Sequence, residues 1–210
     1  MVSKPSYPLI VVLLAALAAI GLITWVAWTL TRPAPRVQVG DVRTVAVAPT
    51  VKIGGPFTLV DHTGRTVTDA TWRGKLLLVY FGYGFCPDVC PTELQIMSGA
   101  LDALGEDAAR VQPLFITVDP ERDTVEFLAD YVSHFHTNLI GLTGTQEAVN
   151  EAATAYRVYH KKVVEDSATD YLVDHSSFVY LIGPDGNFLT MFNTGTDPRT
   201  MAQTILSYLK

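Results

Sequence analysis

A continuous apolar run, KLLLVYFG at residues 75 to 82, constrains the fold more than any other part of this sequence. A strand with one solvated face alternates apolar and polar residues, whereas a strand without alternation is covered on both faces. Such coverage requires a layered structure in which helices pack on a sheet. The two cysteines of the chain, Cys86 and Cys90, follow this run directly. We therefore expect them at the end of a buried central strand.

The segments around this run alternate between strand and helix patterns. A hairpin is predicted over 57–68, and further strands over 111–118, 138–143, 177–183 and 187–192. Helices are predicted after Cys90, from about Asp123 and Glu126, after a Thr145 cap, and from Asp197-Pro198. Residues 161–170 are predicted to form an exposed polar loop. This order predicts a three-layer α/β sandwich with a central mixed β-sheet in a domain over 54–210.

The amino-terminal part of the chain has a different character. Residues 8–30 carry no charge, and as a helix of ~1.5 Å rise per residue they would span roughly 35 Å, enough for a bilayer. A cleaved signal peptide is the alternative, although its apolar core is usually only ~7–15 residues long. We expect a transmembrane anchor over 8–30, a cytoplasmic segment over 1–7 and a proline-containing tether over 31–53.

The charge of the chain argues against one class of partner. The formal net charge is −6, and the largest basic pair is Lys161-Lys162. Nucleic-acid binding requires clustered Lys and Arg to neutralise phosphates. The sequence therefore predicts no nucleic-acid partner.

The cysteine pair allows several interpretations. A structural disulfide would close a very short loop and remove little chain entropy. A dithiol oxidoreductase usually has two residues between its cysteines, and this chain has three. The segment around Cys90 is similar to the peroxidatic segment of peroxiredoxins, but Pro87 replaces the threonine of that family. The remaining interpretation is a metal site, because thiolates select soft ions such as Cu(I).

Two thiolates and one imidazole would suit a three-coordinate Cu(I) ion, so a ligand histidine is expected near the cysteines. Four of the five histidines are interpreted as surface residues: His62, His134, His136 and His160. His175 differs because it immediately precedes the predicted strand over 177–183. In thioredoxin-like sheets, the loop before this strand lies against the cysteine loop. His175 is therefore the candidate third ligand.

Four segments together resemble the Sco/SenC family of membrane-anchored copper proteins: GYGFCPDVCPTEL, FITVDPERDT, AYRVYHKK and VDHSSFVYLIGPDGNF. The resemblance covers nearly all of 54–210 and implies a thioredoxin-like fold. The copper ligands of the family correspond to Cys86, Cys90 and His175. One departure is Gly84, where the family usually has threonine.

The resemblance implies a copper chaperone rather than an enzyme. Its cargo would be Cu(I), with Cu(II) as a second state. Its partners would be the binuclear copper site of cytochrome c oxidase subunit II, an upstream copper donor and a thioredoxin-like reductant. The expected location is the bacterial cytoplasmic (inner) membrane, with a single span and the domain facing the periplasm. The alternative function is a thiol–disulfide oxidoreductase that uses Cys86 and Cys90 as its redox-active pair.

Residues beside the three candidate ligands could assist them. Asp88 and Asp174 are candidates to tune the site or orient the imidazole, with solvated carboxylates as the alternative. Asp119 and Asp123 are interpreted as turn and cap residues. An aromatic group near the cysteines is interpreted mainly as core packing, with shielding of the metal as the alternative; it comprises Tyr80, Phe81, Tyr83 and Phe85.

Overall fold

The computed structural model describes residues 24–25, 28, 52–164 and 171–210. All strands and numbered helices below belong to the second of two compact units, Ala48–Lys210. Of the predicted anchor, Thr24, Trp25 and Trp28 are described, as helical and exposed residues. The rest of the anchor, the segment 1–7 and the predicted tether up to residue 51 lie outside the described residues. Among the residues that are described, no helix is long and apolar enough to cross a membrane.

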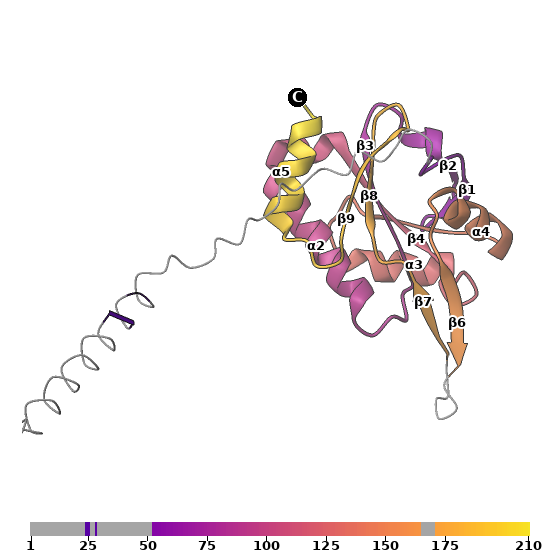
Figure 1. Ribbon diagram of the computed structural model, residues 1–210. Coiled ribbons are helices and arrows are strands. Elements are labelled where there is room, and N and C mark those ends of the chain that lie inside the picture. Colours follow the sequence, from indigo (N-terminus) through magenta and orange to yellow (C-terminus); the bar gives the residue numbers. More distant parts are fainter. Residues whose placement is uncertain (1–23, 26–27, 29–51, 165–170) are drawn as a thin grey trace, which may run out of the picture. The chain divides into compact units, whose positions relative to one another are not determined.

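A seven-stranded mixed sheet forms the centre of the domain, in the order β2-β1-β5-β4-β3-β8-β9 (Figure 1). The strands are β1 Thr58–Asp61, β2 Thr66–Thr68, β3 Leu76–Gly82, β4 Val111–Thr117, β5 Ile140–Thr143, β8 Val179–Ile182 and β9 Phe188–Phe192. β3 pairs with β4 in parallel and with β8 in antiparallel orientation. The predicted central position of the apolar run is confirmed, because every residue of β3 is buried.

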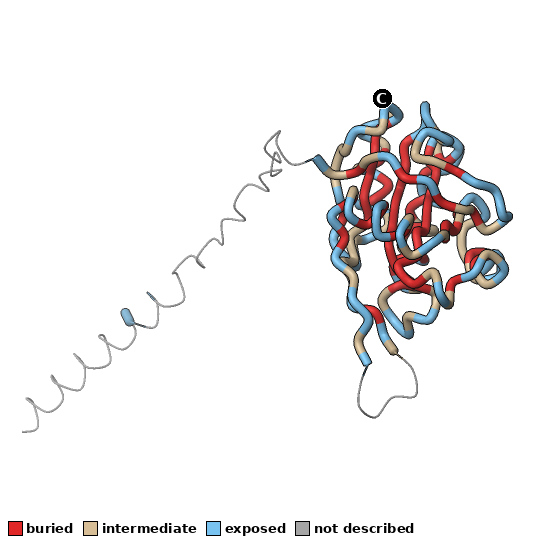
Figure 2. The backbone as a smooth tube through the Cα atoms, turned by 90° about the vertical axis from the view of Figure 1, so that its right-hand side faces the viewer, coloured by how far each residue is buried: buried red, intermediate tan, exposed pale blue. Residues whose placement is uncertain are grey.

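Helices cover both faces of this sheet. The helices are α2 Val89–Leu104, α3 Val125–Ser133, α4 Gln146–Ala155 and α5 Pro198–Tyr208. Successive side chains of a strand point to opposite faces. Tyr80 stacks with Phe115, which contacts Tyr131 of α3, whereas Phe81 contacts Tyr156 at the end of α4. Buried residues accordingly run through the centre of the domain (Figure 2). The predicted three-layer α/β sandwich is confirmed.

The helix starts follow local capping chemistry. Thr145 accepts a hydrogen bond from the N–H of Ala148, and Asp197 accepts from the N–H groups of Arg199 and Thr200, as predicted. The prediction was wrong for α3, where Thr124 accepts from the N–H of Phe127. Asp123 cannot cap this helix because its carboxylate faces inward and bonds Thr117 and Gly84.

The predicted polar loop over 161–170 was wrong for residues 161–164, and its remainder, 165–170, lies outside the described residues. His160–Val164 form strand β6 and Tyr171–His175 form strand β7, which pair as a separate two-stranded antiparallel sheet. The hairpin extends beyond the end of the main sheet (Figure 1). Its register places Lys161 opposite Asp174 and His160 opposite His175. The strand pattern is hard to recognise in the sequence because most of its side chains are polar or exposed rather than alternating with a buried face.

Candidate metal centre

The two cysteines lie where the central strand meets its helix. Cys86 is half-buried in the loop after β3, and its N–H donates to the Tyr83 carbonyl over 3.2 Å. Cys90 is fully buried as the second residue of α2. Both thiols are free rather than joined in a disulfide. The Cys90 N–H donates to the Cys86 sulfur over 3.4 Å, so the helix start directly stabilises negative charge on Cys86.

The two thiols differ in acidity for physical reasons. A hydrogen bond from the Cys90 thiol is the main influence that lowers the pKa of Cys86, and backbone N–H groups act in the same direction. The adjacent Cys86 sulfur and burial raise the pKa of Cys90. The favoured state of the pair therefore has a thiolate at Cys86 and a proton on Cys90. A thiolate is the form that attacks disulfides and binds soft metals.

His175 ends β7 and faces the buried cysteine. Its Nε2 lies 3.3 Å from the Cys90 sulfur, and its Nδ1 lies 3.1 Å from the Ser176 carbonyl oxygen. A carbonyl can only accept, so Nδ1 carries the proton in the neutral ring and Nε2 presents a lone pair toward Cys90. Tyr80 and Tyr83 meet the imidazole edge-on, with ring centroids 6.2 Å and 5.9 Å away. The ring is thus held in the orientation of a ligand.

The structure brings the three predicted ligands into one cluster. His175 contacts Cys90, and Cys90 contacts Cys86. Within the described part of the chain, however, no three His, Cys, Asp or Glu side chains are already set out as a metal-holding group. The donors of the cluster are two soft sulfurs and one imidazole, a set that suits Cu(I) and does not suit magnesium or calcium.

Gly82 provides the space for the buried sulfur. A Cβ atom at this position would lie 2.9 Å from the Cys90 sulfur and 3.0 Å from both Phe115 and Tyr80. All three neighbours are fully buried, so none can move away cheaply. Sequence reasoning missed Gly82, although a glycine within an apolar strand is itself a signal of close approach.

Asp123 holds the cysteine loop through a hydrogen bond to the loop backbone. One of its carboxylate oxygens accepts from the Gly84 N–H over 2.9 Å and from the Thr117 hydroxyl over 2.6 Å. Burial raises the pKa of Asp123 to about 6. Position 84, where the family usually has threonine, needs glycine here for a steric reason, because a Cβ atom would lie 2.2 Å from the ring of Phe127. The glycine allows Phe127 to pack directly beneath the loop.

The carboxylates predicted to assist the ligands do not reach them. Asp88 is exposed at the start of α2 and makes no side-chain capping bond. Asp174 is exposed, and the alternation along β7 directs it away from the face that carries His175. The Ser176 carbonyl orients the imidazole instead. Backbone groups of this kind leave no sequence signal.

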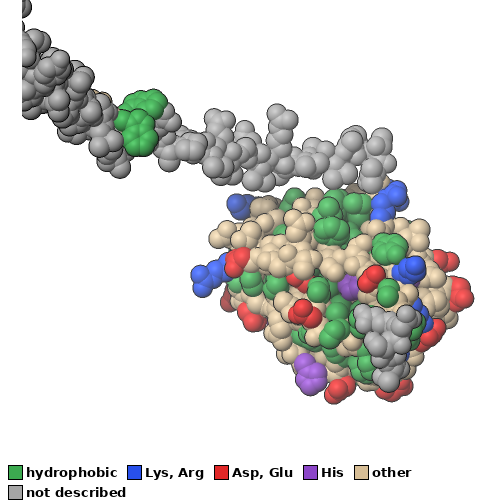
Figure 3. All heavy atoms as spheres, turned by 60° about the horizontal axis from the view of Figure 1, so that its bottom comes forward, with side chains coloured by type: hydrophobic (Ala, Val, Ile, Leu, Met, Phe, Trp, Pro, Cys, Tyr) green, Lys and Arg blue, Asp and Glu red, His purple; other side chains and the backbone are tan. Residues whose placement is uncertain are grey.

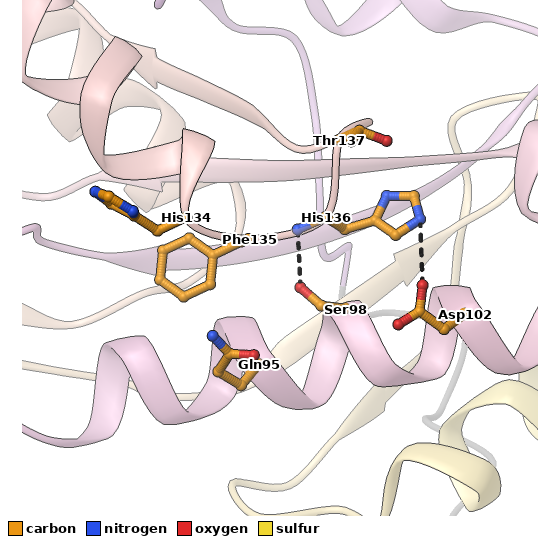
Figure 4. A pocket seen from close by; sticks show the side chains of 7 residues that line it. All are labelled: Gln95, Ser98, Asp102, His134, Phe135, His136 and Thr137. Carbon is orange, nitrogen blue, oxygen red and sulfur yellow. Dashed lines mark hydrogen bonds and ion pairs between the residues drawn. The ribbon is translucent and has the colours of Figure 1, made fainter.

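The other histidines are less uniform than predicted. His134 is exposed, as expected, and His62 is half-buried. His136 is also half-buried and lines a cavity of about 350 Å³ with His134, where the two imidazoles point apart (Figure 4). His160 is half-buried on the same face of the hairpin as His175, and burial and that neighbour lower the pKa of His160.

The aromatic residues near the cysteines divide into two groups. Tyr80, Phe81 and Tyr83 are buried, which confirms their predicted role in core packing. Phe85 remains 45% exposed beside Cys86 and stacks on Phe127 with centroids 4.8 Å apart. It is the one member of the group that presents an aromatic surface to an approaching partner.

The surface charge is mixed. On the face shown in Figure 3, Lys and Arg side chains stand in separate groups among acidic and hydrophobic ones. This face offers no continuous basic surface of the kind that nucleic acids require.

Comparison with known proteins identifies a family that matches this chain. The family model described as SCO1/SenC matches residues 45–210. The human protein "Protein SCO1 homolog, mitochondrial" is 46% identical over 160 residues, which are 75% of this chain and 53% of the human protein. The chain thus spans about half the length of the first curated relatives it matches.

Solved structures share the fold. Copper-bound ScoI of Bradyrhizobium japonicum is 45% identical with a TM-score of 0.70, covering 74% of this chain and 99% of that one. BsSco, a member of the Sco family of cytochrome c oxidase assembly proteins with a reported disulfide switch, is 26% identical with a TM-score of 0.61, covering 77% and 95%. The predicted thioredoxin-like α/β fold with a mixed sheet is confirmed.

Proposed function

The chain belongs to the SCO1/SenC family, and on that premise we propose that it binds copper through Cys86, Cys90 and His175 and delivers it to cytochrome c oxidase during assembly. The target is the binuclear copper centre of subunit II. The protein acts as a metallochaperone, so copper is its cargo rather than a resident catalytic group.

One observation carries the assignment of the ligands: the Nε2 atom of His175 lies 3.3 Å from the Cys90 sulfur, although 84 residues separate them in the sequence. The fold thereby adds an oriented imidazole to a pair of thiols in which Cys86 is poised as the thiolate. Copper-bound relatives of 45% and 42% identity support the choice of metal.

The mixed exposure of the donors suits transfer as well as binding. Cys90 is buried, whereas Cys86 is half-buried in a loop beside the exposed ring of Phe85. An incoming thiolate of a partner can therefore approach from the Cys86 side and replace one donor at a time. Ligand exchange of this kind passes copper onward without releasing it to solvent.

We further propose that residues 8–30 anchor the chain in the bacterial cytoplasmic membrane, with the domain facing the periplasm. The support is the uncharged length of this segment, ~23 residues against the ~20 that a bilayer requires. The proline-containing stretch over 31–53 then acts as a tether. An oxidase copper centre exposed outside the cytoplasm must receive its metal on that side.

A second function has its own support in the unequal acidity of the thiols. The Cys86 thiolate can attack a disulfide of the target to form a mixed disulfide, which releases one target thiolate. This thiolate takes the proton of Cys90, and the Cys90 thiolate then attacks the Cys86 sulfur and displaces the second target thiolate. The target gains two electrons, and this chain is left with a Cys86–Cys90 disulfide. A thioredoxin-like reductant would restore the dithiol. Such a step would prepare the cysteines of subunit II for copper.

Anaerobic titration of the reduced full-length chain with Cu(I) tests the main proposal. We expect one copper per chain, and loss of this site in the Cys86→Ser, Cys90→Ser double variant. His175→Ala should weaken copper binding by more than about tenfold, or about 1.4 kcal/mol, while disulfide exchange by the cysteines continues. His134→Ala is the matched control, because this histidine is exposed and belongs to another part of the domain.

Delivery is tested by incubating the copper-loaded chain with the metal-free copper domain of oxidase subunit II and separating the two proteins. Copper recovered on subunit II supports a chaperone. Normal copper binding by His175→Ala together with lost disulfide reduction would instead favour the oxidoreductase. For the topology, protease treatment of intact spheroplasts should remove a carboxy-terminal tag, and protection of the tag would place the domain in the cytoplasm.

A further inference from the structure

The hairpin that carries His175 has little backbone support of its own. β6 and β7 pair with each other in a sheet separate from the seven-stranded one. Isolated two-stranded hairpins are marginally stable in water. Side chains must therefore hold this hairpin against the cysteine loop, and the residues that do so set where the third ligand lies.

The loop between β4 and α3 makes these contacts through Arg122 and Asp119. The Arg122 guanidinium lies 3.8 Å from the ring centroid of Tyr171, and its Nη1 donates to the Tyr171 carbonyl over 3.1 Å. The Tyr171 hydroxyl donates to Asp119 over 2.8 Å. Arg122 Nε is itself paired with Asp119 over 2.5 Å. Arg122 and Asp119 thus bind both the side chain and the backbone of Tyr171, the first residue of β7.

The same guanidinium also faces the cysteine loop. It lies 4.9 Å from the ring centroid of Phe85 and 5.7 Å from that of Tyr83. Phe85 immediately precedes Cys86, and Tyr83 contacts the His175 ring edge-on. Arg122 therefore occupies the space between the two segments that supply the candidate ligands.

Building on the proposed copper function, we propose that Arg122 is a positioning residue that clasps the β6–β7 hairpin to the cysteine loop and so sets the contribution of His175 to the metal site. The Arg122 side chain is 15% exposed and that of Asp119 is fully buried. The pair is thus shielded from solvent screening, unlike ordinary surface ion pairs.

Lysine could not replace this arginine. A guanidinium is planar, stacks on aromatic rings and donates in several fixed directions at once, whereas an ammonium is a compact point charge. Arg122 uses these properties together, since it stacks on Tyr171 while donating to both Asp119 and the Tyr171 carbonyl. Arg122→Lys consequently keeps the charge and removes the clasp.

The first test needs no metal. Amide hydrogen exchange is measured in the reduced, copper-free full-length chain, for the wild type, Arg122→Lys and the control Arg110→Lys, whose arginine forms an exposed pair with Asp107. We expect exchange at His160–Val164 and Tyr171–His175 to accelerate by about tenfold or more in Arg122→Lys, while β3 and β4 keep their protection. Unchanged hairpin exchange, or equal acceleration throughout the domain, would overturn the proposal.

The second test uses copper. X-ray absorption should show less imidazole scattering in copper-loaded Arg122→Lys than in wild type, and copper affinity should fall by about 10- to 100-fold, as for other residues that orient ligands. When His175→Ala is already present, adding Arg122→Lys should cause no further loss of copper affinity. An equal loss in both backgrounds would mean that Arg122 does not act through His175.

The two tests separate this proposal from the one on which it rests. Failure of the wild-type chain to bind copper would reject the proposed function, and hydrogen exchange would still decide whether the clasp exists. If Arg122→Lys does not fold, Tyr171→Phe replaces it, because this change removes the bond to Asp119 and keeps the ring. It should accelerate hairpin exchange in the same direction by several-fold, and unchanged exchange would reject the clasp.

Discussion

The cysteine half and the histidine half of the candidate site are supported in different ways. Cys86 and Cys90 follow β3, which is flanked by hydrogen-bonded strands on both sides and is buried along its whole length. His175 ends β7, whose strand partner in the described part of the chain is β6 and whose side chains are mostly exposed or half-buried. One half is fixed by the backbone ladder and the core, and the other by side-chain contacts.

This difference suits the proposed function, in which the site must both keep and release a metal. Regions with few buried contacts open at lower free energy than the global unfolding of the domain. We therefore expect the hairpin to open while the cysteines stay in place. In the proposed function, His175 could then leave the metal without disturbing the sulfurs. The two halves should then respond differently to the same mutation.

The largest expected effect comes from one substitution made in both halves. Val79→Ala removes two methyl groups from the fully buried centre of β3 and should lower the unfolding free energy by about 2–3 kcal/mol, measured by urea denaturation. Val173→Ala makes the same change in β7, where the valine is 5% exposed. It should lower global stability by less than about 1 kcal/mol and mainly accelerate hairpin amide exchange.

Equal losses of global stability for the two variants would contradict the comparison, since the hairpin would then unfold only with the whole domain. Burial alone cannot produce the expected difference, because both valines are buried. The result depends on whether the surrounding strands are part of the cooperative core.

The next effect tests how tightly the cysteine half is packed. Gly84→Thr would place a Cβ 2.2 Å from the Phe127 ring, so we expect a loss of about 1–3 kcal/mol in unfolding free energy from overpacking. Phe127→Ala removes the obstacle, and the double variant should be more stable than the sum of the single changes predicts. Strict additivity in a double-mutant cycle would show that the loop moves freely above Phe127.

The sequence predicted the cysteine half because its determinants are local and strong. The apolar run of β3, the helix predicted after Cys90 and the caps at Thr145 and Asp197 each follow from periodicity or side-chain chemistry. The position of Cys86 and Cys90 at a strand–helix junction followed directly from these elements.

The histidine half could not be predicted to the same extent. The β6–β7 hairpin has little buried face, so its side chains lack the alternation that marks most strands. The Ser176 carbonyl that orients His175 is a backbone group. Asp123 was taken for a helix cap because Asp is common there, and only the folded chain shows its carboxylate beneath Gly84. His175 itself was identified through its strand context and the family resemblance.

A smaller effect concerns Asp123 and pH. Its pKa is about 6 in the folded state and 3.8 as the reference for the unfolded chain, so the folded state binds more protons between these values. The stability from protonated Asp123 is thus present at low pH and lost as pH rises through 6. From pH 5 to 7 the wild type should lose about 1 kcal/mol relative to Asp123→Asn. Urea denaturation at both pH values measures this change.

The control for the pH experiment is Asp107→Asn, which alters an exposed carboxylate in a surface pair. The difference between wild type and this control should change little between pH 5 and 7. A wild type that gains stability relative to Asp123→Asn as pH rises would mean that the carboxylate is stabilised as an anion, and that the Gly84 and Thr117 bonds outweigh its burial.

The smallest effect should come from Lys162, which pairs with Glu121 over 2.5 Å and lies 4.6 Å from the ring centroid of Tyr171. The two side chains are 38% and 64% exposed, so solvent screens the pair. Lys162→Gln should change the unfolding free energy by less than about 0.5 kcal/mol, and 0.5 M salt should remove even that difference. Lys161→Gln is the matched control, because Lys161 is exposed on the opposite face of β6. A loss above about 1 kcal/mol, unaffected by salt, would contradict this view, because an exposed lysine would then share the role that we assign to the shielded Arg122.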